Sequence, residues 1–300
     1  MPTDTRDPGR FAGLLSLLVL YTVWSTTYLA IRVAVRPGSG FAPFVMSGTR
    51  LLAAGAMLFV VAALLRRPLR ASRSDLAKLA VSAALLWLGG NGLVTWAVQY
   101  AASGYAALMV GAMPIWTTVI ESLLDRSLPT RRVIAALLVG FAGVALLTVP
   151  ELQSASGAET MAVVALVLAP VSWGSGAVFQ SRRPVTAPPI ASAGWQQLFG
   201  GVGFIAISRL LSEPAPNPTA QAFAGWLYLV VFGGLAFIAF VQALRLLPTR
   251  LVMTYAYVNP VGAAALGWLV LGEPITPWTV AGAILVIAGV AGVFRERYGV

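Results

Sequence analysis

The chain of 300 residues contains no cysteine and no histidine, and its only lysine is Lys78. Without these side chains it cannot form disulfides, use a thiolate nucleophile or an imidazole base, or build the usual zinc, haem and iron–sulfur ligand sets. The single lysine lies in SDLAKLA, away from any glycine-rich loop, so the phosphate cradle of an ATPase is missing. We therefore expect no metal and no cofactor, and these absences disfavour an enzyme.

Charged side chains are also scarce, at 10% of the chain, whereas hydrophobic residues reach 58%. Soluble domains usually carry about 25% charged residues. A soluble core could not cover this much apolar surface, so lipid must be the solvent for most of the chain. The composition predicts an all-α, polytopic membrane protein, because helices satisfy their own backbone hydrogen bonds in lipid.

Charges and clusters of proline or glycine divide the chain into ten apolar segments, each near the ~20 residues that cross a bilayer as a helix. The first is longer than the ~7–15-residue core of a signal peptide, so we expect it to be retained as a span. Two longer connections, PELQSASGAETM and LSEPAPNPTAQA, carry turn-forming residues. The predicted spans are 11–35, 41–65, 76–99, 103–124, 131–149, 160–181, 190–211, 221–246, 250–272 and 277–294.

The twenty basic residues are distributed unevenly over the two sides of this ten-span arrangement. Sixteen fall on one side and three on the other, and Arg50 alone lies within a span. The positive-inside rule then places both termini in the cytoplasm. Nineteen of the twenty basic residues are arginine, which with the abundance of Ala, Gly and Val indicates a bacterial genome, so we expect a multi-pass protein of a bacterial inner membrane. The basic surplus meets anionic lipid head groups in the bilayer, and we expect no nucleic-acid partner.

The second half of the chain resembles the first when it is shifted by 146 residues. Pro114 then aligns with Pro260, and AGVA occurs at both 142–145 and 288–291. The clusters WSTTY at Trp24 and WGSGA at Trp173 lie in the first span of each half. Because each half has an odd number of spans, the halves would insert in opposite orientations, as in many secondary transporters. We predict two inverted five-helix repeats, 1–150 and 151–300, around a central cavity.

Polar and aromatic side chains gather on single faces of several spans. In the third span Trp87, Asn91, Thr95 and Gln99 follow one another every four residues, which places them on one face of an α-helix. In the first span polar and aromatic residues recur at helical spacing around Trp24. One interpretation is the wall of a cavity that binds a small molecule. The other is ordinary helix packing, in which small residues such as serine let helices approach. The predicted substrate-binding residues are Trp24, Tyr28, Arg50, Trp87, Asn91, Thr95, Gln99, Trp173, Tyr255, Tyr257 and Asn259.

Arg50 and three prolines are the other unusual residues within the spans. A charge inside the membrane is a candidate functional residue. Pairing with backbone carbonyls, or snorkelling to the membrane surface, is an equal alternative for Arg50. Pro114, Pro170 and Pro260 lack the N–H that a helix needs, which predicts hinges or special packing at these positions.

Several motifs resemble a known family over nearly the whole chain. These are W-S-T-T-Y…I-R from Trp24, R-L-L-A-A-G from Arg50, and L-G-E-P-I-T…A-G-A-I-L-V-I-A-G-V from Leu271. They are similar to the EamA-type transporters of the drug/metabolite transporter superfamily, and most similar to bacterial exporters of aromatic and other neutral amino acids. The resemblance implies ten helices in two inverted halves, with a cavity lined mainly by spans 1, 3, 4, 6, 8 and 9.

These observations predict a monomeric transporter that exports neutral or aromatic amino acids, or similar small metabolites, by alternating access. An exporter of lipophilic cationic drugs is the alternative, because aromatic walls also suit cations. Such an exporter would be expected to carry a carboxylate near the middle of the membrane. A nucleotide-sugar exchanger is expected to have several cations facing the cavity, whereas only Arg50 lies deep within a predicted span. An intramembrane enzyme would need a base for its nucleophile, and the chain has no histidine to serve as one.

Overall fold

The computed structural model describes residues 8–154, 157–247, 252 and 255–298; of 8, 148–154, 256–257, 293–294 and 296–298 it describes only the backbone. All regular secondary structure in these ranges is helical. Most predicted spans are single helices, whereas the third, fourth and eighth consist of consecutive helical pieces. The elements are α1 (Pro8–Val35), α2 (Pro43–Leu64), α3 (Arg73–Ala83), η1 (Ala84–Asn91), α4 (Gly92–Ala97), α5 (Ser103–Gly111), α6 (Met113–Leu124), α7 (Arg131–Ser154), α8 (Gly157–Arg182), α9 (Pro189–Leu210), α10 (Ala220–Tyr228), η2 (Leu229–Gly233), α11 (Gly234–Leu246), α13 (Tyr255–Leu271) and α14 (Pro277–Tyr298).

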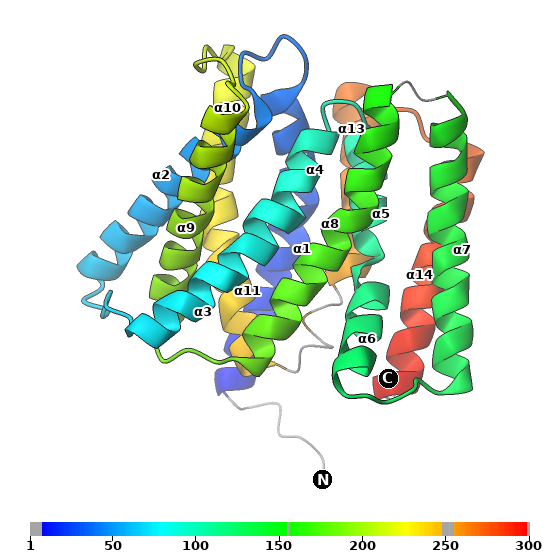
Figure 1. Ribbon diagram of the computed structural model, residues 1–300, viewed down its shortest axis with the longest axis horizontal. Coiled ribbons are helices and arrows are strands. Elements are labelled where there is room, and N and C mark those ends of the chain that lie inside the picture. Colours follow the sequence, from blue (N-terminus) through cyan, green and yellow to red (C-terminus); the bar gives the residue numbers. More distant parts are fainter. Residues whose placement is uncertain (1–7, 155–156, 248–251, 253–254, 299–300) are drawn as a thin grey trace.

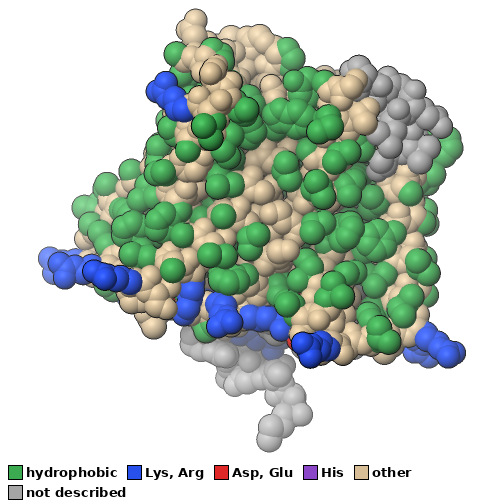
Figure 2. Space-filling view, in the orientation of Figure 1, with side chains coloured by type: hydrophobic (Ala, Val, Ile, Leu, Met, Phe, Trp, Pro, Cys, Tyr) green, Lys and Arg blue, Asp and Glu red, His purple; other side chains and the backbone are tan. Residues whose placement is uncertain are grey.

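Seven helical stretches within the described residues are long and apolar enough to cross a membrane. Two shorter apolar helices, Val258–Leu271 and Pro277–Gly292, follow them near the C-terminus. Large hydrophobic side chains such as Leu138, Val202 and Leu269 are more than half exposed. Figure 2 shows such side chains over the flank of the bundle, with Lys and Arg concentrated along one end. An apolar flank above a charged end is the surface of a multi-pass membrane protein.

The predicted loop over 150–161 is the main error in the helix boundaries. Helix α7 extends to Ser154 and α8 already begins at Gly157, so most of this segment is helical. Its Glu, Leu, Gln and Ala residues are good helix formers. Glu159 also lies in the first turn of α8, where a negative charge stabilises the helix N-terminus. The second predicted loop is confirmed between α9 and α10, and the Thr219 side chain caps α10 there.

Two helix pairs support the opposite sides of the bundle. Figure 1 shows α2 beside α9 on one side and α7 beside α14 on the other. Glycines allow close backbone approach in the second pair: a Cβ on Gly143 would lie 2.6 Å from the backbone nitrogen of Val286. The beginning of α1 and the end of α14 lie at the same end of the bundle.

Two short π-helical segments interrupt the third and the eighth helical stretch. They are η1, between α3 and α4, and η2, between α10 and α11. A π-helical turn contains an extra residue compared with an α-helix, and such turns occur frequently at functional sites. The fourth stretch is interrupted as well, because α5 ends before Ala112 and Pro114 lies in the first turn of α6.

Three carboxylates join a loop to the start of a helix distant in the sequence: Glu213 and Glu273 lie in loops, and Asp75 lies in the first turn of α3. Glu213 accepts hydrogen bonds from the backbone of Phe44 and Val45 at the start of α2, at 3.0 and 2.7 Å. Glu273 accepts from the backbone and hydroxyl of Ser103 at the start of α5, at 2.9 and 2.8 Å. Asp75 accepts from the Thr186 hydroxyl, just before α9. Each contact supplies negative charge near a helix N-terminus, where the macrodipole favours it.

Candidate functional site

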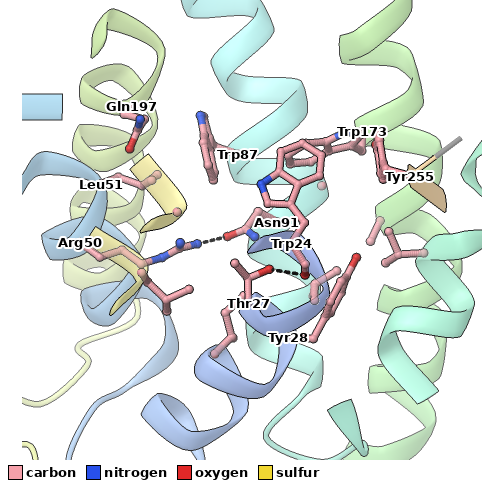
Figure 3. Close-up of a pocket in the computed structure, with 17 residues that line it drawn as sticks. Trp24, Thr27, Tyr28, Arg50, Leu51, Trp87, Asn91, Trp173, Gln197 and Tyr255 are labelled. Atoms are coloured by element: carbon pink, nitrogen blue, oxygen red, sulfur yellow. Dashed lines mark hydrogen bonds between the residues drawn. The ribbon is translucent and has the colours of Figure 1, made fainter. Parts of the chain in front are cut away.

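A cavity lies between the helices of both halves of the chain. The volume open to a water-sized molecule is about 70 Å³, within a wider space of about 730 Å³ that includes solvent at its mouth. Figure 3 shows its side chains converging from α1, α2, η1, α8, α9 and α13. The lining residues are Trp24, Thr27, Tyr28, Ile31, Arg50, Leu51, Trp87, Gly90, Asn91, Val94, Val110, Ala169, Trp173, Gln197, Leu229, Gly233 and Tyr255.

Aromatic rings form one wall of the cavity. Trp24 contacts Trp173 edge to face, with 5.5 Å between ring centroids, and Tyr255 in the same way at 4.9 Å. Trp87 continues the cluster, 6.0 Å from Trp173 and 4.6 Å from Phe237. These distances lie in the range preferred by aromatic pairs. The first helices of both halves, α1 and α8, therefore meet at one wall.

Gly90 makes room for this wall. A Cβ on Gly90 would lie 2.9 Å from the ring of Trp173 and 3.0 Å from its Cβ, closer than real Cβ atoms approach. Gly90 lies in η1, next to Asn91 and three residues after Trp87. The π-helical segment thus brings an aromatic ring, a glycine and an amide to the cavity together.

Arg50 lies on the opposite side of the cavity from Tyr255, as Figure 3 shows. Its guanidinium donates a hydrogen bond from Nη2 to Oδ1 of Asn91. It also lies over the ring of Trp87, at 5.7 Å from the centroid, close enough for a cation–π contact. Only 4% of Arg50 is exposed. The side chain is therefore directed into the protein, and neither pairing with backbone carbonyls nor snorkelling describes its contacts.

Seven of the predicted substrate-binding residues line the cavity: Trp24, Tyr28, Arg50, Trp87, Asn91, Trp173 and Tyr255. Three others lie elsewhere. Thr95 is buried behind Asn91 and donates to its Oδ1 at 3.3 Å. Gln99 donates to the backbone oxygen of Trp96, and Asn259 accepts from the hydroxyl of Ser25 at 3.2 Å. The side chain of Tyr257 lies outside the described residues.

The predicted four-residue ladder of the third span is divided by η1. The prediction assumed a regular α-helix from Trp87 to Gln99, whereas a π-helix occupies its first part and ends at Asn91. The four-residue spacing survives from Asn91 to Thr95, which are hydrogen-bonded, but α4 ends at Ala97, before Gln99. Trp87 and Asn91 line the cavity, whereas Thr95 and Gln99 do not.

The prolines have different local roles. Pro114 lies at the start of α6, after the interruption at Ala112, whereas Pro170 and Pro260 lie inside α8 and α13. Pro170 is next to Ala169, which lines the cavity. An interior proline leaves a carbonyl one turn earlier without its helical partner. The prediction of hinges at these three positions stays a prediction.

Sequence reasoning missed Gln197, Thr27 and Leu51. Gln197 projects from α9, and its side chain is 1% exposed. The pair Gln196–Gln197 within an otherwise apolar segment was the available signal, since amides are costly in lipid without partners. The resemblance implied a cavity lined mainly by spans 1, 3, 4, 6, 8 and 9. The structure adds the second span through Arg50 and Leu51, and the seventh through Gln197.

Comparisons with known proteins agree with this architecture. The model of the EamA-like transporter family matches residues 11–149 and 160–295. The chain is 33% identical over 287 residues to YedA of Escherichia coli K12, named an uncharacterized inner membrane transporter, covering 92% of this chain and 90% of that protein. It is 25% identical over 280 residues to the uncharacterized transporter YoaV of Bacillus subtilis, covering 92% and 94%.

A solved crystal structure has the same fold, with a TM-score of 0.68 at 20% sequence identity, over 98% of this chain and all of the other. The family match extends over both halves of the chain, and the similarity to YedA covers most of each protein. The chain belongs to the EamA-like transporter family.

Proposed function

We propose that the protein is a secondary transporter of a bacterial inner membrane that exports neutral and aromatic amino acids by alternating access. The observation that carries this proposal is the cavity itself. It combines an aromatic wall of Trp24, Trp173 and Tyr255 with a single buried cation, Arg50. An aromatic side chain fits the first, and a carboxylate complements the second.

The same lining argues against an exporter of lipophilic cations. None of the described residues around the cavity is acidic, and Arg50 would repel a cationic ligand. A nucleotide sugar, with two phosphates, would need more positive charge than one arginine supplies. A molecule with one carboxylate and an apolar or aromatic body matches the cavity best.

The proposed transporter has ten spans arranged as two inverted repeats, 1–150 and 151–300. Three features support this arrangement. The π-helical segments η1 and η2 occupy the third helical stretch of each half. The pairs α2–α9 and α7–α14 each join corresponding helices, the second and the fifth of their halves. Two of the carboxylate contacts are reciprocal: Asp75 reaches the start of α9, and Glu213 the start of α2.

The proposed orientation has both termini in the cytoplasm. Exposed arginines follow α2 at Arg66, Arg67 and Arg70, and others begin α7 at Arg131 and Arg132. These segments lie at the end of the bundle where α1 begins and α14 ends (Figure 1). A basic end of this kind faces the cytoplasm under the positive-inside rule.

Uptake by purified protein in liposomes tests the proposal. Labelled tryptophan, methionine, a nucleotide sugar and a lipophilic cation are offered separately, with and without a proton gradient. We expect saturable flux of the two amino acids, and at least a tenfold lower rate in Trp173→Ala. The matched control is Trp278→Ala, which removes an indole that is 55% exposed and outside the cavity.

The outcomes separate the candidate functions. Flux of the lipophilic cation without amino-acid flux would assign the protein to drug export. Amino-acid flux that is unchanged by the gradient would identify a facilitator, and flux driven by it a proton-coupled exporter. Equal losses in Trp173→Ala and Trp278→Ala would refute the assignment of the cavity as the substrate site.

A further inference from the structure

We infer that Arg50, together with Gln197 and Trp87, forms the subsite for the substrate's carboxylate, with the Trp24–Trp173–Tyr255 wall receiving the apolar body. This inference rests on the proposed function and specifies how its site selects among substrates. It excludes amines without an acidic group, which a purely aromatic cavity would accept.

The first argument is the missing counter-ion of Arg50. Buried charges in proteins are normally paired, because a charge removed from water is costly without an opposite charge nearby. Two cations nearer the surface have such partners: Arg182, 40% exposed, contacts Asp125 at 2.8 Å, and Lys78, 32% exposed, contacts Asp75 at 3.8 Å. Among the acidic residues that the structure describes, none pairs with Arg50. Within the part of the chain that the structure describes, its charge is met only by the Asn91 amide oxygen and the Trp87 ring.

The second argument is that several hydrogen-bond donors on side chains lining the same cavity as Arg50 are unused. The Nε of Arg50, the indole nitrogen of Trp87 and the amide nitrogen of Gln197 are buried, and no acceptor for them lies within the described part of the chain. The three side chains are 4%, 5% and 1% exposed, and all three line the cavity. Buried donors left without acceptors are destabilising, so a ligand that brings acceptors is favoured.

Carboxylate is the ligand chemistry that answers both observations. It carries one negative charge for Arg50, and its two oxygens have about four lone-pair sites for N–H donors. Arginine binds carboxylates with particular geometric specificity because its N–H groups are arranged as a planar fork. A neutral acceptor such as an amide would use the donors but leave the charge unpaired.

The arrangement in Figure 3 also orients the substrate. Arg50 and Gln197 come from α2 and α9, whereas Trp173 and Tyr255 lie across the cavity on α8 and α13. Trp87 lies between the two groups: it contacts Trp173 with its ring and carries the cation of Arg50 over its face. A bound amino acid would therefore direct its carboxylate toward α2 and α9 and its side chain toward α8.

The test measures binding directly, so that it does not depend on transport. A ligand that binds the folded state raises the midpoint of thermal unfolding. Purified protein in detergent is titrated with L-tryptophan, with indole-3-propionate, which keeps the carboxylate but lacks the amine, and with tryptamine, which keeps the amine but lacks the carboxylate. We expect both carboxylates to raise the midpoint and tryptamine to require at least tenfold higher concentration for the same shift.

Variants identify the residues responsible. Arg50→Gln is expected to abolish the shift with both carboxylates, Arg50→Lys to retain part of it, and Gln197→Leu to weaken it severalfold. The control Arg209→Gln removes an exposed arginine from the last turn of α9 and is expected to behave as wild type. If Arg50→Gln does not fold, the wild-type comparison and Arg50→Lys remain decisive.

The results distinguish this inference from the proposed function. No shift with either carboxylate, an equal shift with tryptamine, or a full shift in Arg50→Gln would overturn the carboxylate subsite. Tryptophan flux in liposomes is scored separately. Tryptophan flux without a binding preference for carboxylates would support the proposed transport function and refute the carboxylate subsite. A carboxylate-specific shift without tryptophan flux would support the subsite and indicate that the transported substrate is another carboxylate.

Discussion

Trp24 and Trp173 meet edge to face, with 5.5 Å between their ring centroids, although they lie 149 positions apart in the chain. Each comes from the first helix of its half, α1 or α8. The contact joins the two halves at the wall of the cavity, so a substrate held against these rings touches both halves at once. Movement of one half relative to the other would change the site directly.

The aromatic wall should depend on ring character at position 24. Trp24 packs among Trp173, Tyr255 and Phe240, and Trp24→Ala removes the ring that the proposed substrate would contact, an aromatic pair being worth about 0.5–1.5 kcal/mol beyond its buried area. We expect at least a tenfold weaker apparent affinity for tryptophan in liposome uptake, since ~1.4 kcal/mol is a factor of ten. Trp24→Phe should retain most of it. An unchanged affinity in Trp24→Ala would contradict the assignment of Trp24 to the substrate site. The control is Trp268→Ala, because Trp268 is 58% exposed and does not line the cavity.

Two glycines of the cavity should respond to alanine in opposite ways. In Gly90→Ala the new Cβ meets Trp173 at 2.9 Å, and such overpacking typically costs about 1–3 kcal/mol. Gly233 has nothing within 4 Å of an added Cβ, so Gly233→Ala should stabilise the protein by ~0.5–1 kcal/mol through reduced backbone freedom. Thermal unfolding in detergent measures both midpoints. A stabilised Gly90→Ala would mean that the wall moves freely.

The carboxylate of Glu273 should contribute more to stability than an exposed ion pair. Glu273→Gln keeps the shape but loses the charge and one acceptor oxygen that now bind Ser103. We expect a loss of about 1–3 kcal/mol in the free energy of unfolding. Asp125→Asn, which breaks a half-exposed pair with Arg182, should cost about 0–1 kcal/mol. Comparable losses in the two variants would show that the Glu273 contact is not a cap of special value.

The proposed orientation can be tested with single cysteines, because the chain contains none. Ser127 and Ala215 are exposed in connections that the proposed topology places on opposite sides of the membrane. In intact cells, a membrane-impermeant thiol reagent should label Ala215→Cys and should label Ser127→Cys only after the cells are opened. The reverse pattern would invert the protein, and labelling of both in intact cells would refute the ten-span topology.

The helices could be predicted from sequence because their signal is local. Apolar runs bounded by charges or by Pro and Gly correspond closely to α1, α2 and α9. The cap of α14 was likewise predictable, since the Thr276 hydroxyl accepts from the backbone of Thr279 and Pro277 begins the helix. The polar residues in mid-span identified most of the cavity, since lipid excludes such side chains unless they have partners.

What could not be predicted depends on contacts between distant segments. Glu273 lies just before the start of α14 in the sequence, yet its carboxylate caps α5. The sequence left a functional and a structural interpretation of Arg50 equally open, and it gave no sign that Asn91, far along the chain, would be its hydrogen-bond partner. The π-helical segments have no distinct spacing in the sequence, and the apolar run around Gln99 did not show that α4 ends at Ala97. Gln197 was missed because the pair Gln196–Gln197 in an apolar run does not indicate which neighbour each amide faces.

The clustering of indoles around the cavity also gives the protein an optical property. Trp24 and Trp87 each lie about 6 Å or less from Trp173, close enough for excitation to pass among the three rings before emission. A molecule seated between them would change the polarity around the emitting ring and the transfer among its neighbours. The fluorescence of the unlabelled protein should therefore report when the cavity is filled, and the time course of that signal would follow each half-cycle of transport without an attached dye.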